Sequence, residues 1–242
     1  EYQDAEEGLV DITLDHLSHV PFHVEDEQTT LEISAYEEQL IDPAMEALAQ
    51  KIDGVIAQQV LDAAQSEAQI ADIADSPDGK ANYVFRRSRA ILGRRKFPQA
   101  QRVAVISPEG SVPVLGDPLI IQANTSGWTD ALREGTIGKL LGFNTFESQV
   151  LGAGAGNLAE ADGVAFHRTA VAMAVRQLAE PKGLESKQVA LVDYKGLALR
   201  VVYSYDHGAK KDLVSVDILY GTVETRPEGA IEIDLGEEPV GS

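Results

Sequence analysis

One long segment near the amino end constrains the fold more than any other part of the chain. Residues 10–24 alternate apolar and polar side chains, with Val20 and Phe22 on the apolar side, a pattern that predicts a β-strand with one buried face. About fifteen residues at ~3.3 Å each would extend roughly 50 Å, beyond the usual length of a strand. Pro21 removes a ladder donor, so we expect a bend or an edge position there. We therefore expect the strand to leave its own domain and a second copy of the chain to cover its apolar side.

A long helix is predicted after this strand. Asp42 and Pro43 have the N-cap and first-turn identities of a helix start, and residues 43–64 would form a rod of about 33 Å. The capping-box spacing at residues 34–37 predicts a short helix before it, separated by a kink. The core-facing stripe of the long helix follows three-four spacing and consists of Met45, Leu48, Ile52, Val55, Ile56 and Val60.

The rest of the chain mixes helical and strand patterns in unequal clusters. Helices are predicted at residues 81–92, ended by Gly93, and at residues 164–178. Strands are predicted at 102–107, at 135–150 as a pair or one bent strand, and then in a meander at 188–193, 197–205, 212–220 and 230–235. Such clusters favour an α+β fold over a doubly wound parallel sheet.

Composition excludes several classes of function. The 242 residues suffice for one large or two modest domains, and the 39 acidic against 20 basic side chains give a net charge of −19. Such a charge repels nucleic acids and anionic membranes, so a groove-reading nucleic-acid protein is not expected. There is no cysteine for disulfides or thiolate metal sites. Apolar runs such as residues 118–121 are too short to span a bilayer.

The alternating glycines Gly152, Gly154 and Gly156 raise the possibility of a phosphate-binding loop. A dinucleotide fingerprint needs a third glycine where this chain has Asn157, and an acidic residue about twenty positions further on, where residues 174–176 have none. We therefore expect a linker. A small-molecule enzyme that uses this loop is the alternative, and it predicts nucleotide binding that Gly154→Val abolishes.

Histidines do not form an obvious metal or catalytic site. On a strand, His16 faces away from His19 and His23, and the latter two are roughly 13 Å apart. His167 and His207 stand alone in the sequence. We expect no catalytic residue, no metal and no cofactor.

A basic cluster is the most informative charge feature. Six of the 20 basic residues fall within eleven positions, a concentration that indicates a partner of opposite charge. Three interpretations stay open: a solvated face, a contact with acidic segments of a neighbouring copy such as residues 1–7 or 25–27, and a contact with nucleic acid phosphates. The cluster consists of Arg86, Arg87, Arg89, Arg94, Arg95 and Lys96.

Several stretches resemble the major capsid proteins of tailed bacteriophages, which have the Hong Kong 97-type fold. One is similar to the family's returning strand and spine helix, and another to its helix, loop and Arg-containing strand. A third has the Gly-x-Ile-Gly and Gly-Phe pattern, and the last ones are similar to the closing helix and sheet. These stretches are residues 10–64, 94–118, 133–148, 165–175, 194–206 and 214–233.

The resemblance implies a fold with an extended β-loop, a spine helix, and peripheral and axial domains. Residues 1–24 would be the returning strand of the extended loop, 25–80 and 206–242 the peripheral domain, and 81–205 the axial domain. The family's N-terminal arm and outgoing loop strand would precede residue 1, so we expect the chain to begin inside that loop.

The resemblance also implies a function. Pentamers and hexamers of the chain would build an icosahedral shell around a phage double-stranded DNA genome, with weak non-specific contact to the DNA. Scaffolding, portal and decoration proteins are the other partners implied, and the location is the virion, assembled in the host cytoplasm. An encapsulin-like nanocompartment shell is the alternative within the same structural class.

Overall fold

The computed structural model describes residues 9–25, 42–66, 70–76, 80–118, 138–152, 161–180, 189–194, 196–206, 208 and 211–236. The chain divides into two compact units. Unit 1 comprises Glu1–Ile52 and Met173–Val223, and unit 2 comprises Asp53–Ala172 and Glu224–Ser242. The predicted glycine positions 154 and 156, the helix at 34–37, and His207 lie outside the described residues.

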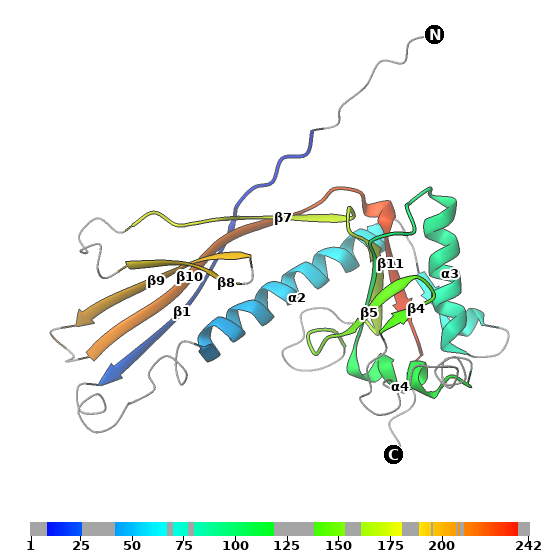
Figure 1. The fold of residues 1–242 in the computed structure, drawn as a ribbon, viewed down its shortest axis with the longest axis horizontal. Helices are drawn as coiled ribbons and strands as arrows, with labels where there is room; N and C mark the ends of the chain where they lie inside the picture. Colours follow the sequence, from blue (N-terminus) through cyan, green and yellow to red (C-terminus); the bar gives the residue numbers. More distant parts are fainter. Residues whose placement is uncertain are drawn as a thin grey trace, which may run out of the picture. The chain divides into compact units, whose positions relative to one another are not determined.

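Unit 1 is built on an antiparallel sheet (Figure 1). Its strands follow the order β1 (His16–Glu25), β10 (Lys211–Glu224), β9 (Leu197–Asp206) and β8 (Val189–Tyr194), and β7 (Val171–Arg176) also pairs with β10. Residues 17–23 of β1 alternate in exposure, as the sequence predicts, and Ser18 is buried opposite Ile218. The buried face of this sheet includes Leu199, Val201, Val214, Val216 and Ile218.

The amino-terminal strand differs from its prediction in length and in partner. β1 begins at His16, and all ten of its residues pair with β10 of the same chain. β1 is therefore part of the unit 1 sheet, because β10 is long enough to pair with every residue of β1. Its other side has no strand partner in the part of the chain that the structure describes, so Pro21 does lie on an edge strand. The carbonyl group of Thr13, which precedes β1, lies close to Gly221. A Cβ atom at position 221 would lie 2.0 Å from the Thr13 carbonyl oxygen.

The predicted long helix is confirmed as α2 (Asp42–Ser66). Leu48, Ile52 and Val60 of the predicted stripe are buried to 2%, 2% and 1% exposure, since side chains three and four positions apart share one face of a helix. The first part of α2, to Ile52, belongs to unit 1, and the part from Asp53 belongs to unit 2.

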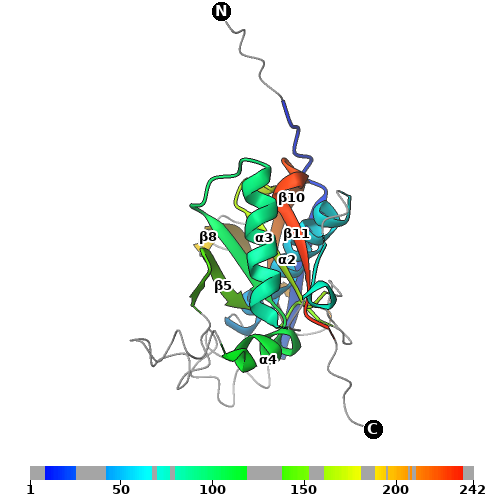
Figure 2. The ribbon, with the colours of Figure 1, turned by 90° about the vertical axis from the view of Figure 1, so that its right-hand side faces the viewer.

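Unit 2 is built on a mixed six-stranded sheet. Two neighbouring pairs, β2–β11 and β3–β5, are parallel, and the others are antiparallel. Figure 2 shows α3 (Ala81–Arg94) lying along this sheet, where Phe85 and Leu92 pack with Ile106, Phe143 and Ile231 in one buried core. The strand order is β2 (Ile70–Asp72), β11 (Ala230–Asp234), β6 (Gly163–His167), β3 (Arg102–Ile106), β5 (Phe143–Glu147) and β4 (Lys139–Leu140).

A second core in unit 2 involves the carboxyl half of α2. Val60 and Leu61 pack there with Val164 of β6 and Ala230 of β11. Val164 and Ala165 are consecutive strand residues and therefore point to opposite faces of the sheet, and Ala165 belongs to the core that contains α3. Both faces of this sheet are therefore covered by apolar side chains.

The amino end of α3 is capped by a residue from the end of α4 (Pro108–Gly116). Lys80, the N-cap residue of α3, makes no side-chain cap. Instead, Asp117 Oδ2 accepts hydrogen bonds from the backbone N–H of Asn82 at 2.9 Å and from its Nδ2 at 2.5 Å. Asp117 is 3% exposed, so a buried carboxylate satisfies an N–H that the first turn of a helix leaves free.

The prediction of a helix at residues 164–178 is wrong. The segment forms β6 and β7, joined by a turn at residues 168–170. β6 is a central strand and is almost entirely buried, so its apolar residues do not alternate and fit helical spacing by coincidence. The predicted strand near 230–235 exists as β11, but it lies in the unit 2 sheet and not in the meander. The helix α4 and the short 3-10 helices η2 (Ile73–Asp75) and η4 (Pro227–Gly229) were not predicted.

The bounds of the two compact units differ from the predicted domain boundaries at residues 24, 80 and 205. Residues 173–205 lie in unit 1 because β8 and β9 continue the sheet that contains β10 and β1. The partition describes roles in a shell, and it stays a prediction.

Candidate functional site

The predicted basic cluster lies on α3 and its carboxyl end. Arg86, Arg89 and Arg94 are exposed on the helix, and Lys96 is exposed just beyond it in a left-handed conformation with φ of 62°. Arg87 is half-buried and forms an ion pair with Asp75 at 2.6 Å. The cluster is thus distributed between solvent and contacts inside unit 2.

This part of unit 2 carries charge of one sign. Residues 81–108, from α3 through β3, contain seven of the chain's 20 basic residues and none of its 39 acidic residues. The buried side of α3 is apolar, with Val84, Phe85 and Leu92 fully buried. The basic side chains that remain exposed therefore have no acidic neighbour on their own segment.

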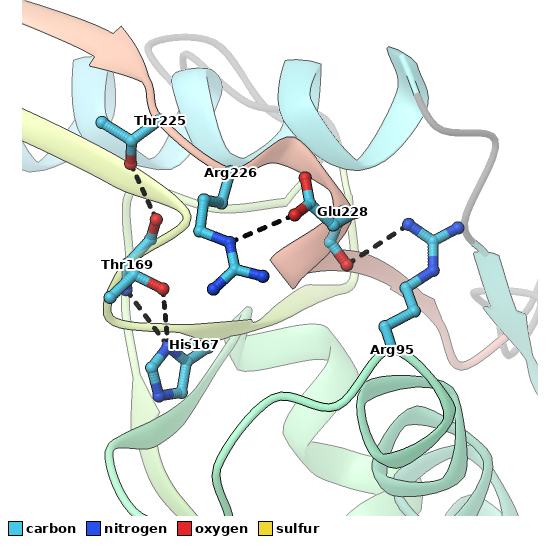
Figure 3. A network of polar contacts seen from close by, with 6 residues as sticks. All are labelled: Arg95, His167, Thr169, Thr225, Arg226 and Glu228. Atoms are coloured by element: carbon cyan, nitrogen blue, oxygen red, sulfur yellow. Dashed lines mark hydrogen bonds and ion pairs between the residues drawn. The ribbon is translucent and has the colours of Figure 1, made fainter. Parts of the chain in front are cut away.

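Three separate segments meet at the carboxyl end of α3 (Figure 3). Arg95, the C-cap residue of α3, donates from Nη1 to the carbonyl oxygen of Glu228 at 3.4 Å. Thr225 donates from Oγ1 to the carbonyl oxygen of Thr169 at 2.7 Å, which joins the segment before η4 to the β6–β7 turn. The same turn contacts the segment after α3, because the backbone N–H of Arg168 donates to the Gln101 carbonyl at 3.1 Å.

Arg226 is held in a fixed position within this meeting point. Its Nε donates to Glu228 Oε1 at 3.1 Å, and its guanidinium carbon lies 4.3 Å from the centre of the Phe97 ring. A cation over an aromatic face is attracted by the ring's negative face. Phe97 is itself only 4% exposed, because its ring is packed in the core that contains α3. Arg226 keeps a side-chain exposure of 49% and so presents its charge to solvent.

His167 is the buried titratable group beneath this surface. Its Nδ1 lies 2.8 Å from Thr169 Oγ1 and accepts from the Thr169 backbone N–H at 3.3 Å. Burial lowers the pKa of His167, and the charges of Arg102 and Arg226 lower it further, against an opposing hydrogen bond with the backbone of Ala100. The imidazole is therefore held neutral under positively charged residues.

Arg102 at the start of β3 connects these elements from below. It is 3% exposed, and its guanidinium donates to the carbonyls of Phe97 and Pro98, both at 2.8 Å, and of Arg89 at 3.4 Å. Burial lowers the pKa of Arg102, and the charge of Arg89 lowers it further. These three bonds fix the segment that follows α3 against the sheet.

Sequence reasoning missed Arg168 and Arg226 as members of the basic surface. Each is a single basic residue in a turn, about 70 and 130 positions from Arg94 along the chain, so no local clustering marks it. They join the cluster only because β6 and β11 are neighbours in the sheet. The prediction of residues 164–178 as a helix hid the turn that carries Arg168.

Val20 and Phe22 are half-buried on β1, opposite Val216 and Val214 of β10. His19 and His23 are exposed on the other face of β1, and His16 stacks on Tyr220 with ring centres 5.2 Å apart. Among the described residues, no group of three or more His, Cys, Asp or Glu side chains is arranged to hold a metal ion. No helix in the described part of the chain is long and apolar enough to cross a membrane.

Comparisons with known proteins identify the family. A family model described as phage capsid protein matches residues 19–210, and no curated protein matches the chain in sequence. A structure from Mycobacterium phage Che8 is similar at 22% identity and a TM-score of 0.66, with 96% of this chain and 77% of that chain covered.

Two further structures have the same fold. The capsid structure of cyanophage P-SCSP1u is 15% identical, with a TM-score of 0.64 and 97% and 79% of the two chains covered. The virus-like particle from Pyrococcus furiosus is 12% identical, with a TM-score of 0.52 and 90% and 76% covered. The match over residues 19–210 and these likenesses confirm the predicted Hong Kong 97-type fold: the chain belongs to the phage capsid protein family and is a shell-forming major capsid protein.

Proposed function

We propose that many copies of this chain assemble, through pentameric and hexameric clusters, into an icosahedral shell that encloses double-stranded phage DNA. The observation that carries this proposal is the family match over residues 19–210, together with the shared fold of phage capsid structures. The net charge of −19 supports weak, non-specific contact with the enclosed DNA, because like charges prevent tight adsorption. The role is structural and needs no catalytic residue or cofactor.

The assembly roles of the chain's parts belong to the same proposal. Residues 1–24 act in the extended loop, 25–80 and 206–242 in the peripheral domain, and 81–205 in the axial domain. Val20 and Phe22, which are half-buried on the edge strand β1, take part in lateral contacts between copies. The basic cluster from Arg86 to Lys96 contacts a partner of opposite charge. The absence of acidic residues from the surrounding segment, residues 81–108, supports this role.

Other virion components complete the proposal. Scaffolding, portal and decoration proteins act with the shell during assembly in the host cytoplasm, and the mature location is the virion. An encapsulin-like compartment is the second candidate, supported by the likeness to the Pyrococcus furiosus virus-like particle. The family model described as phage capsid protein, which matches residues 19–210, favours the phage shell.

Electron microscopy of the expressed full-length product tests the proposal. We expect closed shells, and in the presence of the phage's own packaging components we expect nuclease-protected DNA inside them. Isolated subunits under all assembly conditions would contradict the proposal. Shells that contain protein cargo and never DNA would favour the encapsulin-like alternative.

A further inference from the structure

The basic surface at the carboxyl end of α3 lies on three segments that contact one another, and one of its members, Arg226, has a side chain held by neighbouring residues. We define this surface as Arg94, Lys96, Arg168 and Arg226, which are all exposed. Phe97 and Glu228 position Arg226, and the backbone bond from Arg168 to Gln101 positions the β6–β7 turn. Arg102 anchors the segment after α3 through Phe97 and Pro98. Charged side chains that merely keep a helix soluble need no such support from three segments.

The surface keeps an excess of positive charge. In the segments 94–102, 168–170 and 225–229, the only acidic residue is Glu228, and it already pairs with Arg226. Arginine binds carboxylates through a planar, two-pronged donor geometry. An acidic peptide segment therefore fits this surface chemically.

We propose that the basic surface at the end of α3 binds the acidic segment at residues 1–7 of a second copy of the chain. This segment contains Glu1, Asp4, Glu6 and Glu7 and no basic residue. The other acidic run has three carboxylates, at residues 25–27, and begins at Glu25, whose backbone is already paired with Lys211 in the β1–β10 register. Charge complementarity thus favours residues 1–7 as the occupant.

A second copy of the chain is the appropriate source of the acidic segment, because the proposed shell, on which this inference rests, consists of many copies of the chain. Each copy would offer one basic surface and one acidic segment, which makes the contact heterologous. Heterologous contacts generate closed rings when the rotation closes, and rings of five and six are the clusters that the proposed function requires. DNA phosphates are less suited, because the field of a chain with net charge −19 repels a long polyanion.

Cysteine pairs provide the decisive experiment, since the chain contains no cysteine of its own. Shells of the double variant Glu6→Cys, Lys96→Cys are oxidised and run on a non-reducing gel. We expect a ladder of covalent multimers. The matched control is Glu6→Cys, Lys139→Cys, because Lys139 is exposed on β4, at the edge of the unit 2 sheet, and we expect it to give no ladder.

Each other result is decisive. A cross-link confined to monomers would place the contact within one copy and overturn the inference. Intact shells without a ladder would also overturn it while leaving the proposed function standing. If the unmodified chain forms no shells under any condition, the proposed function fails and the inference fails with it.

Charge reversal gives an independent measurement. We expect Arg94→Glu, Arg168→Glu to lose shell formation, and Glu6→Arg, Glu7→Arg in the same chain to restore it. Shells that form normally with the reversed surface would overturn the inference. Shells that form normally but no longer retain DNA would assign the surface to phosphate binding and overturn it as well.

Discussion

The buried guanidinium of Arg102 allows a sharp test of how the end of α3 is held. Two of its three hydrogen bonds, to the carbonyls of Phe97 and Pro98, are 2.8 Å long, and a bond to a charged group contributes about 1.5–3 kcal/mol. Desolvation of the charge offsets part of this, as the lowered pKa of Arg102 indicates. We expect Arg102→Met to lower the free energy of unfolding by about 2–4 kcal/mol.

A lysine variant separates charge from geometry. Arg102→Lys keeps the positive charge, but one ammonium group cannot reach the carbonyls of Phe97, Pro98 and Arg89 with the same fork of donors. We expect it to lose at least about half as much stability as the Met variant. The assay is urea unfolding of purified full-length subunits, followed by far-ultraviolet circular dichroism. A Lys variant as stable as the natural chain, or a more stable Met variant, would refute the reasoning.

Three further predictions concern unit 1 and unit 2 separately. Asp117→Ala should destabilise the protein by about 1–3 kcal/mol in the same unfolding assay, because the Asn82 donors lose their buried acceptor. Gly221→Ala should lower the melting temperature, since a Cβ would lie 2.0 Å from the Thr13 carbonyl. His167→Asn should flatten the loss of stability in acid. The pKa of His167 is lowered in the folded state, so the unfolded chain binds the proton first below about pH 6.5, and stability falls from there to the folded-state pKa.

Matched variants control these measurements. Glu109→Ala removes an exposed carboxylate from the first turn of α4 and should change stability little. Gly116→Ala adds a Cβ that meets nothing within 4 Å. His19→Asn changes an exposed histidine and should leave the acid slope as it is in the natural chain. If a control variant changes stability as much as its test variant does, that result would count against the contact under test.

Periodic patterns predicted two helices of the described residues correctly, α2 and α3. α2 and α3 carry apolar stripes at three-four spacing over more than three turns, and Asp42 and Pro43 mark the start of α2. Residues 164–178 misled the same reasoning, because β6 is apolar on both faces and β7 is half-buried from Val171 to Val175. α4 was missed because Pro108, Gly110 and Pro113 are turn residues in isolation.

The candidate site could be predicted only in part. The run of basic residues in α3 is visible locally, but its extension to Arg168 and Arg226 depends on strand order. No spacing rule brings a turn after β6 beside the segment before β11. The resemblance to capsid proteins carried more information on fold than periodicity did, because it compares the order of several motifs at once.

Among the described residues, β1 pairs with another strand on one side only, and this has a consequence for how the chain avoids uncontrolled polymerisation. The unpaired N–H and C=O groups of an edge strand are a template on which other strands can dock. Strands stacked in this way grow into fibrils. A protein that must close into a finite container at high concentration is especially exposed to this hazard. Pro21 lies within β1 and offers no N–H, so it breaks the row of donors that an incoming strand would need. A Pro21→Val chain should therefore form ribbon-like aggregates at the expense of closed particles.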